Sequence, residues 1–176
     1  EQAHPVLLEA RSVIESTGAL SSLAACVQSL ALASHLIGRH EESRSFHGVA
    51  LDLCRTIGPS RRAATTLLNL GNLSYNMGEV EVAVACTQAA AEQLRGWGGS
   101  GYHLAFALGN LAGFQIAQGD LAAANETAIE ALPLLAGAGI VPYVAAGMTV
   151  LFVLLLTMLQ LGVSSPDYGW VDLLIA

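Results

Sequence analysis

Residues 67–85, LLNLGNLSYNMGEVEVAVA, join an apolar segment to an alanine-rich segment through a single glycine, Gly78. The pattern predicts a helix, a glycine turn and a second helix. A related phrase recurs about every 40 residues along the chain, and recurrence at a fixed period is the mark of a repeat architecture. The hydrophobic pattern therefore predicts a chain built from repeated helix pairs.

Glycines mark the predicted helix ends at intervals of about 20 residues. The series consists of Gly18, Gly38, Gly58, Gly78, Gly98, Gly119, Gly139 and Gly162. A helix commonly stops at a residue of positive φ, which glycine adopts at little cost. We therefore expect each unit to contain two helices of about 15 residues.

Small residues recur in register with alternate glycines of this series. Nine residues before them stand Ser29-Leu30-Ala31, Asn69-Leu70-Gly71 and Asn110-Leu111-Ala112, and five residues after them stand Ser43, Ala83 and Ala124. A further set, twelve residues after them, is Ala50, Ala90 and Ala131. Small side chains let helix backbones approach closely, so these positions predict where paired helices cross.

The repeat register predicts one domain with internal divisions. We expect residues 1–18 to be the second helix of a truncated repeat, residues 19–58, 59–98 and 99–139 to be three repeats, and residues 140–176 to be an incomplete C-terminal repeat. Because the chain opens EQAHPVLLEA without Met or a secretory leader, we interpret it as a piece of a longer protein. Pro133 lies inside the helix predicted for 121–137, which it should kink or shorten.

Composition and charge exclude some functions. The net charge is −7, and all seven basic residues are arginine. A nucleic-acid surface needs clustered cations, whereas only Arg61 and Arg62 are adjacent, so we expect no nucleic-acid binding by this segment. Three widely separated cysteines, Cys26, Cys54 and Cys86, predict core packing without disulfides in a reducing, cytoplasmic compartment.

The repeated phrase resembles the tetratricopeptide repeat (TPR) family. The matching residues are Leu70-Gly71, Gly78 and Ala83 in one unit, Leu111-Ala112, Gly119 and Ala124 in the next, and Leu30-Ala31 and Gly38 in a weaker copy. The longer period is similar to a variant in C-terminal regions of bacterial maltose-activator-type transcriptional regulators and related ATPase or kinase regulators. The resemblance covers residues 1–139 and implies an all-α, TPR-like solenoid of about four repeats with a right-handed superhelix.

The resemblance also implies a concave groove lined by the first helix of each pair, where TPR domains bind protein or peptide. The groove positions carried over are Gln28, Ser29, His35, Asn69, Asn72, Tyr75, Asn76 and Asn110. Since Asn69, Asn72 and Asn76 share one helical face, they favour a hydrogen-bonding ladder for an extended peptide. A solvated polar face or hydrogen bonds between helices would use the same residues, and these alternatives stay open. Family members that hold a C-terminal carboxylate use Lys or Arg beside such Asn residues, and none stands at these positions.

Motifs for catalysis or cofactors are weak. The segment GWGGSG, residues 96–101, satisfies the G-x-G-x-x-G pattern of dinucleotide-binding sites, but that pattern requires a preceding strand, and AAAEQLR is helical in composition. Without lysine, the segment has no P-loop lysine or Schiff-base residue. The histidines form no H-E-x-x-H motif, and no spacing indicates a catalytic triad. We therefore expect a non-catalytic protein without cofactor or metal.

Residues 140–163 carry no charge and include GMTVLFVLLLTMLQLG, which is long enough to suggest a membrane span. No basic cluster flanks the segment, so we expect a buried helix of a further repeat in its place. Its apolar face would be covered by missing repeats or by a second copy of the chain in a homodimer. The residues predicted for self-association are Leu151, Leu154, Leu155 and Met158.

These observations leave two classes of function. The first is a protein-interaction or self-association scaffold within a larger bacterial signalling or transcriptional regulator, with protein or peptide partners. The second is a sensor domain that binds a small molecule or peptide in the groove and regulates a neighbouring domain. The sequence favours the scaffold.

Overall fold

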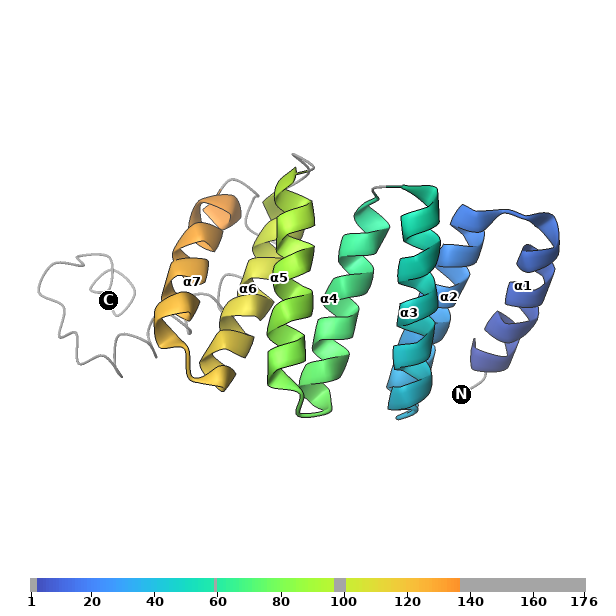
Figure 1. The fold of residues 1–176 in the computed structure, drawn as a ribbon, viewed down its shortest axis with the longest axis horizontal. Coiled ribbons are helices and arrows are strands. Elements are labelled where there is room, and N and C mark those ends of the chain that lie inside the picture. The colour runs from blue at the N-terminus through green and yellow to red at the C-terminus, as the bar shows by residue number, and fades with distance from the viewer. Residues whose placement is uncertain (1–2, 59, 97–100, 137–176) are drawn as a thin grey trace, which may run out of the picture.

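A computed structural model describes residues 3–58, 60–96 and 101–136, and all the regular structure in these ranges is α-helical. Figure 1 shows the helices following one another in chain order along the long axis of the molecule, with the N-terminus at one end. The described helices are α1 (Ala3–Thr17), α2 (Leu20–Leu36), α3 (His40–Ile57), α4 (Arg61–Asn76), α5 (Val80–Gly96), α6 (Gly101–Gln118) and α7 (Leu121–Ala136). Helices α2 and α3, α4 and α5, and α6 and α7 form the three most extensively packed pairs.

The glycine series ends helices as expected. Gly38, Gly78 and Gly119 have φ values of 80°, 82° and 89°, and each lies between the two helices of a pair. In each turn the glycine N–H donates to the carbonyl three residues back, and the following N–H donates to the carbonyl five residues back, at 2.8–3.0 Å. This is the Schellman arrangement, which satisfies carbonyls that a helix end leaves free. Gly98, Gly139 and Gly162 lie outside the described residues.

The core within each pair is built from small side chains. Ala31, Ala83, Ala90 and Ala112 are fully buried, and Gly71 of α4 faces Ala83 and Thr87 of α5. In the first pair, the buried Ser43 hydroxyl donates a 2.7 Å hydrogen bond to the carbonyl of Ala31. Because small residues stand on both sides of each crossing, the paired helices pack along most of their lengths. Cys26 and Cys54 are buried, Cys86 is partly buried, and all three are free thiols, as the sequence predicted.

The solenoid has an inner and an outer row of helices. Helix α4 contacts both α2 and α6 through the backbone, whereas α3, α5 and α7 approach one another no closer than 8 Å between Cα atoms. When helices lie closer together in one row than in the other, the whole stack curves toward the more closely packed row. The row α2, α4 and α6 therefore forms the concave side, which we call the inner face.

Two ion pairs span the wider gaps of the outer row. The Arg44 guanidinium of α3 lies 2.6 Å from Glu79, which precedes α5, and also donates to the sulfur of Met77. Arg95 of α5 binds both carboxylate oxygens of Glu130 on α7, at 2.7 and 2.8 Å. Long side chains thus connect outer helices whose backbones do not meet.

Two local expectations are resolved by the helix bounds. Helix α7 continues through Pro133 to Ala136, so Pro133 occupies the last turn and does not shorten the predicted helix appreciably. Its missing N–H leaves the carbonyl of Ile129 without the usual helical donor.

Helix α5 runs up to Gly96, so the residues before GWGGSG form a helix and not the strand that a dinucleotide site requires. Among the described residues, no helix has the length and hydrophobicity needed to cross a membrane.

Candidate functional site

The inner face carries most of the polar residues that the sequence singled out, and several bridge one inner helix to the next. The Asn110 side chain of α6 donates a 3.2 Å hydrogen bond to the side-chain oxygen of Asn72 on α4. Both residues are half-buried. The two amides therefore fix the spacing between the second and third inner helices.

Two similar contacts join α4 to α2. The Asn76 side-chain nitrogen lies 3.3 Å from Nε2 of His35, which accepts the hydrogen bond in the neutral tautomer that carries its proton on Nδ1. Near the other end of these helices, Arg62 donates to the side-chain oxygen of Gln28 at 3.1 Å. The sequence did not single out Arg62 as a groove residue, because the family positions placed no cation there. Its partner Gln28 lies 34 residues away, so only the packing of α4 on α2 reveals the contact.

Tyr75 connects α4 to α6 by an aromatic contact. Its ring stacks on that of the buried Phe114, with 4.7 Å between centroids and 26° between ring planes. Tyr75 nevertheless remains 42% exposed. One part of the side chain is thus structural, and the rest is available to a ligand at the inner face.

Asn69 differs from the other predicted residues because its side chain forms no hydrogen bond among the described residues. It is half-buried and lies one turn before Asn72 on the same helical face. Asn72 uses its oxygen for Asn110 and keeps both N–H donors, whereas Asn110 keeps its oxygen. Hydrogen bonds between helices, one of the alternatives left open by the sequence, are therefore present, and free amide groups remain beside them.

Apolar side chains of the inner face were not predicted. In the repeat register, Leu32 and Leu36 of α2 occupy the positions of Asn72 and Asn76, and they are 48% and 76% exposed. Phe106 of α6 is 40% exposed and lies one turn before Asn110 on the same face. The glycine register could have identified Leu32 and Leu36, since it aligns them with Asn72 and Asn76, whereas it aligns Phe106 with Thr65. Exposed leucine and phenylalanine beside amide groups make this face suitable for binding a chain with apolar side chains.

The remaining predicted residues do not extend this site. The Ser29 hydroxyl donates to the Ala25 carbonyl of its own helix. Leu151, Leu154, Leu155 and Met158, predicted for self-association, lie outside the described residues. Within the described ranges, no three histidine, cysteine or acidic side chains gather closely enough to hold a metal ion.

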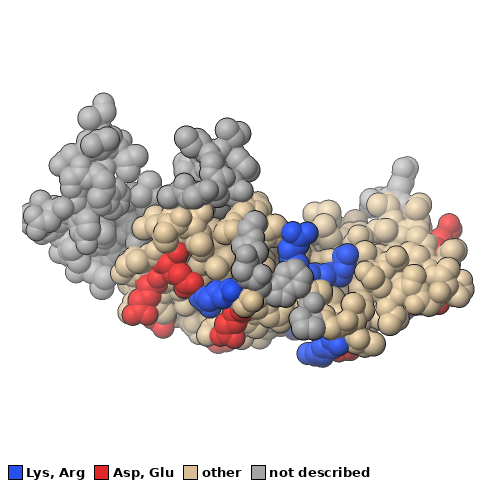
Figure 2. All heavy atoms as spheres, turned by 90° about the horizontal axis from the view of Figure 1, so that it is seen from above, with Lys and Arg blue, Asp and Glu red and all other residues tan. Residues whose placement is uncertain are grey.

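Charge is sparse on the molecule. Figure 2 views the helix ends at which α3 and α5 stop and α4 begins, and most of that surface is uncharged, with basic groups near the middle of the row. The arginines of the terminal turns at this end are Arg55, Arg61, Arg62 and Arg95. Apart from Arg62, which donates to Gln28, the inner face presents mainly amides and apolar groups, so hydrogen bonding and burial of apolar surface dominate what it can offer a ligand.

Comparison with known proteins supports the fold but not a specific family. No family model and no curated protein sequence matches the chain. Among solved structures, BtubC (BKLC) from P. vanneervenii superposes with a TM-score of 0.74 and 20% identity over 81% of this chain. The chain spans 58% of the length of BtubC.

A second similar structure is the type III secretion chaperone SycD of Yersinia enterocolitica, solved in complex with a peptide of the translocator YopD. It superposes with a TM-score of 0.61 and 19% identity over 76% of this chain and 91% of SycD. At these identities the likeness concerns the fold alone. The chain therefore has an all-α, TPR-like solenoid fold, in agreement with the prediction from its glycine and alanine register.

Proposed function

We propose that this chain is a non-catalytic binding module that holds an extended segment of a partner protein along its inner face. The observation that carries the proposal is the Asn72–Asn110 pair, whose remaining donors and acceptor lie beside the unbonded amide of Asn69. A carboxamide offers both a donor and an acceptor, so it can match the N–H and C=O groups of a peptide backbone. The bridge holds two of these amides in place before a partner arrives, which lowers the entropic cost of binding.

The exposed apolar side chains supply the second part of the recognition. Leu32 and Leu36 stand at the α2 end of the inner face, and Phe106 stands on α6. Burying such side chains contributes about 25 cal/mol for each Å² of apolar surface removed from water. We expect the apolar side chains of the partner segment to contact these residues. Its backbone N–H and C=O groups would form hydrogen bonds with the amides.

The peptide bound to SycD supports this proposal by analogy, because SycD has a similar fold and its structure contains a peptide of its translocator partner.

The place of the module in a larger bacterial regulator of signalling or transcription rests on the sequence resemblance. Self-association through Leu154 and Leu155 is likewise a prediction from the sequence. Replacing both leucines with glutamate should reduce the particle mass measured by light scattering, or abolish soluble expression; unchanged mass and yield would contradict it.

A peptide selection tests the main proposal. Random 12-residue peptides displayed on phage are selected against the immobilised domain, and the recovered sequences are measured by fluorescence anisotropy. We expect Asn69→Ala and Leu32→Ser to weaken binding at least fivefold with little change in melting temperature. The matched control, Glu92→Gln, changes an exposed residue of the outer helix α5 and should leave affinity unchanged. Recovery of no peptide, or equal affinity for both inner-face variants and the wild type, would overturn the proposal.

A further inference from the structure

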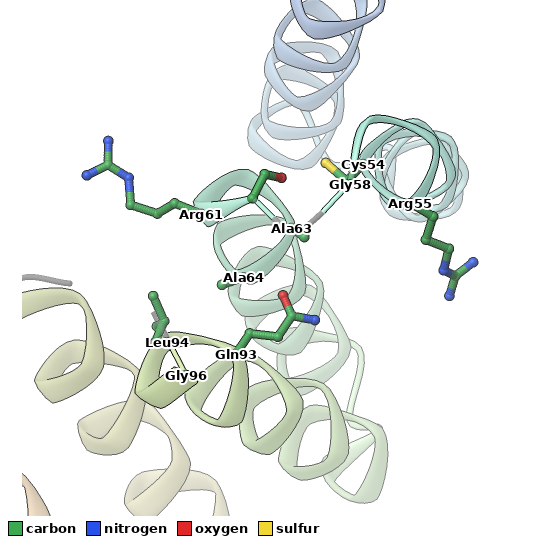
Figure 3. A pocket seen from close by; sticks show the side chains of 10 residues that line it. Cys54, Arg55, Gly58, Arg61, Ala63, Ala64, Gln93, Leu94 and Gly96 are labelled. Atoms are coloured by element: carbon green, nitrogen blue, oxygen red, sulfur yellow. The ribbon is translucent and has the colours of Figure 1, made fainter. Parts of the chain in front are cut away.

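A pocket of about 510 Å³ opens at one end of the solenoid, between the outer helices α3 and α5 and above the start of α4. Figure 3 shows Cys54 of α3, Ala63 and Ala64 of α4, and Gln93 and Leu94 of α5 around it. Its volume lies in the range of about 300–1,000 Å³ that is usual for small-molecule sites. The pocket does not include the polar residues of the inner face described above.

The neighbouring repeats carry a pair of leucines at the corresponding positions. In the first repeat the pair is Leu23 and Leu53, which both pack against the core cluster around Leu30. In the third repeat the pair is Leu104 and Leu134, which both pack against the cluster around Leu108. Each pair consists of one residue near the start of the inner helix and one near the end of the outer helix.

The second repeat lacks this pair. In the glycine register, Ala63 occupies the position of Leu23 and Leu104, and Gln93 occupies the position of Leu53 and Leu134. Both residues line the pocket. The replacement of two leucines by a small residue and a polar residue therefore accounts for the cavity, because both replacements line it and Ala63 is much smaller than leucine.

One polar group in this pocket lacks a partner. A Cβ atom on Gly101, at the start of α6, would lie 3.5 Å from the Leu134 side chain, so Leu134 covers the helix start in the third repeat. The corresponding residue of the second repeat is Ser60, which occupies the N-cap position of α4 but forms no side-chain capping hydrogen bond. The Ser60 hydroxyl is buried without a hydrogen-bond partner among the described residues. Such a group is usually satisfied by water or by a ligand.

The charges around the pocket favour an anion. Its described lining contains Arg55 and Arg61 and no acidic residue. The guanidinium of Arg55 lies 2.6 Å from Asp52, whereas Arg61 forms no ion pair among the described residues. Both arginines point outward at the sides of the pocket in Figure 3. The start of α4 adds N–H groups and the positive end of the helix dipole.

We propose that this pocket binds a small apolar carboxylate. The hydrocarbon part lies against Ala63, Ala64 and Leu94, where the missing leucines would otherwise pack. The carboxylate lies at the opening, where Arg61 and the backbone N–H groups of the first turn of α4 attract it. This site is separate from the proposed peptide-binding face, so either proposal can fail without the other.

Octanoate is the probe for the test, with 1-octanol and octylammonium of equal chain length as comparisons. Binding is followed by NMR through the methyl signals of Ala63 and Ala64. We expect octanoate to shift these signals at concentrations at least fivefold lower than octanol, and octylammonium to bind more weakly than either. Octylammonium binding as tightly as octanoate, or octanoate shifts confined to residues away from the pocket, would overturn the proposal.

Variants that restore the repeat pattern give the second arm. Ala63→Leu should fill the pocket, weaken octanoate binding at least tenfold and preserve or raise the melting temperature. Should that variant not fold, Gln93→Leu replaces it, because leucine is the residue at the same position of both neighbouring repeats. Ala85→Leu on the exposed face of α5 is the matched control and should leave binding unchanged.

Arg61→Gln should abolish the preference for octanoate over octanol while retaining octanol binding. Octanoate affinity that is unchanged in a folded Ala63→Leu or Gln93→Leu protein, or a preference for octanoate that survives Arg61→Gln, would contradict the assignment.

Discussion

Gly71 of α4 and Thr87 of α5 are in such close contact that a Cβ atom on Gly71 would lie 2.4 Å from the Thr87 hydroxyl oxygen. The same Cβ would lie 3.2 Å from the backbone carbonyl oxygen of Ala83. The first and third repeats have alanine at the position of Gly71, namely Ala31 and Ala112. The Thr87 hydroxyl and the Ala83 carbonyl therefore leave no room for a side chain at position 71 of the second pair.

We expect Gly71→Ala to lower the free energy of unfolding by about 1–3 kcal/mol, because overpacking at this crossing outweighs the roughly 1 kcal/mol that alanine gains in helix propensity. Urea unfolding measures the change. Gly71→Ala combined with Thr87→Ala reproduces the Ala112–Ala128 pair of the third repeat and should recover most of the loss. A double variant no more stable than Gly71→Ala alone would show that contact with Thr87 is not the cause.

His47 should make stability depend on pH. It is 2% exposed, and burial, aided by the nearby charge of His35, lowers its pKa from 6.5 to about 4. Between these values the unfolded chain binds a proton that the folded chain does not, so stability falls as the pH decreases from about 6.5 to about 4. The complete loss amounts to about 3 kcal/mol, at 1.36 kcal/mol for each pKa unit. Urea unfolding at several pH values between 7.5 and 4.5 measures it.

The control is His47→Thr, which introduces the residue found at the same position of the second repeat, Thr87. This variant should be less stable at pH 7.5 but show a flatter dependence down to pH 4.5. Glu42, whose pKa is lowered mainly by the hydrogen bond from Ser34, contributes stability that is lost only as the pH falls below its ordinary value of 4.5. An equal slope in His47→Thr and wild type between pH 6.5 and 4.5 would exclude His47 as the source.

The Arg95–Glu130 pair should contribute modestly to stability. The contact is bidentate, but each side chain is 41% exposed, so solvent screens the interaction. A double-mutant cycle with Arg95→Gln and Glu130→Gln should give a coupling energy of about 0.5–1 kcal/mol. The coupling should shrink in 1 M NaCl. A coupling above about 2 kcal/mol, or one insensitive to salt, would indicate that the pair is effectively buried.

Ser43→Ala should cost little, although Ser43 is fully buried. Its hydroxyl donates to the Ala31 carbonyl, and a hydrogen bond of this kind contributes about 1 kcal/mol. The other two repeats already have alanine at this position, Ala83 and Ala124. We expect a loss of at most about 1 kcal/mol by urea unfolding, with an unchanged denaturant slope. A loss above about 2 kcal/mol would mean that the hydroxyl also determines how the α2–α3 pair packs.

The sequence by itself determined the helix pairs, their turns and the small residues at their crossings. Gly38 and Gly78 could be assigned from sequence because ending a helix at a positive φ is a local property of the backbone. Ala31 and Ala83 could be assigned because the same crossing recurs at a fixed period. Of the inner face, the sequence identified the asparagines but not Leu32 and Phe106.

Only the tertiary structure decided which of these residues meet. The contact between Arg62 and Gln28 joins positions 34 residues apart on different helices. The pocket is formed by three helices, and Ala63 and Gln93 stand in it where the other repeats have leucine. These two replacements leave a cavity only because α3 and α5 lie apart on either side of α4. Local sequence patterns specify where helices begin and end and which face of a helix is buried, because these properties depend on residues within a few helical turns of one another. The spaces left between packed helices depend on the shapes of distant side chains, and the sequence pattern does not contain that information.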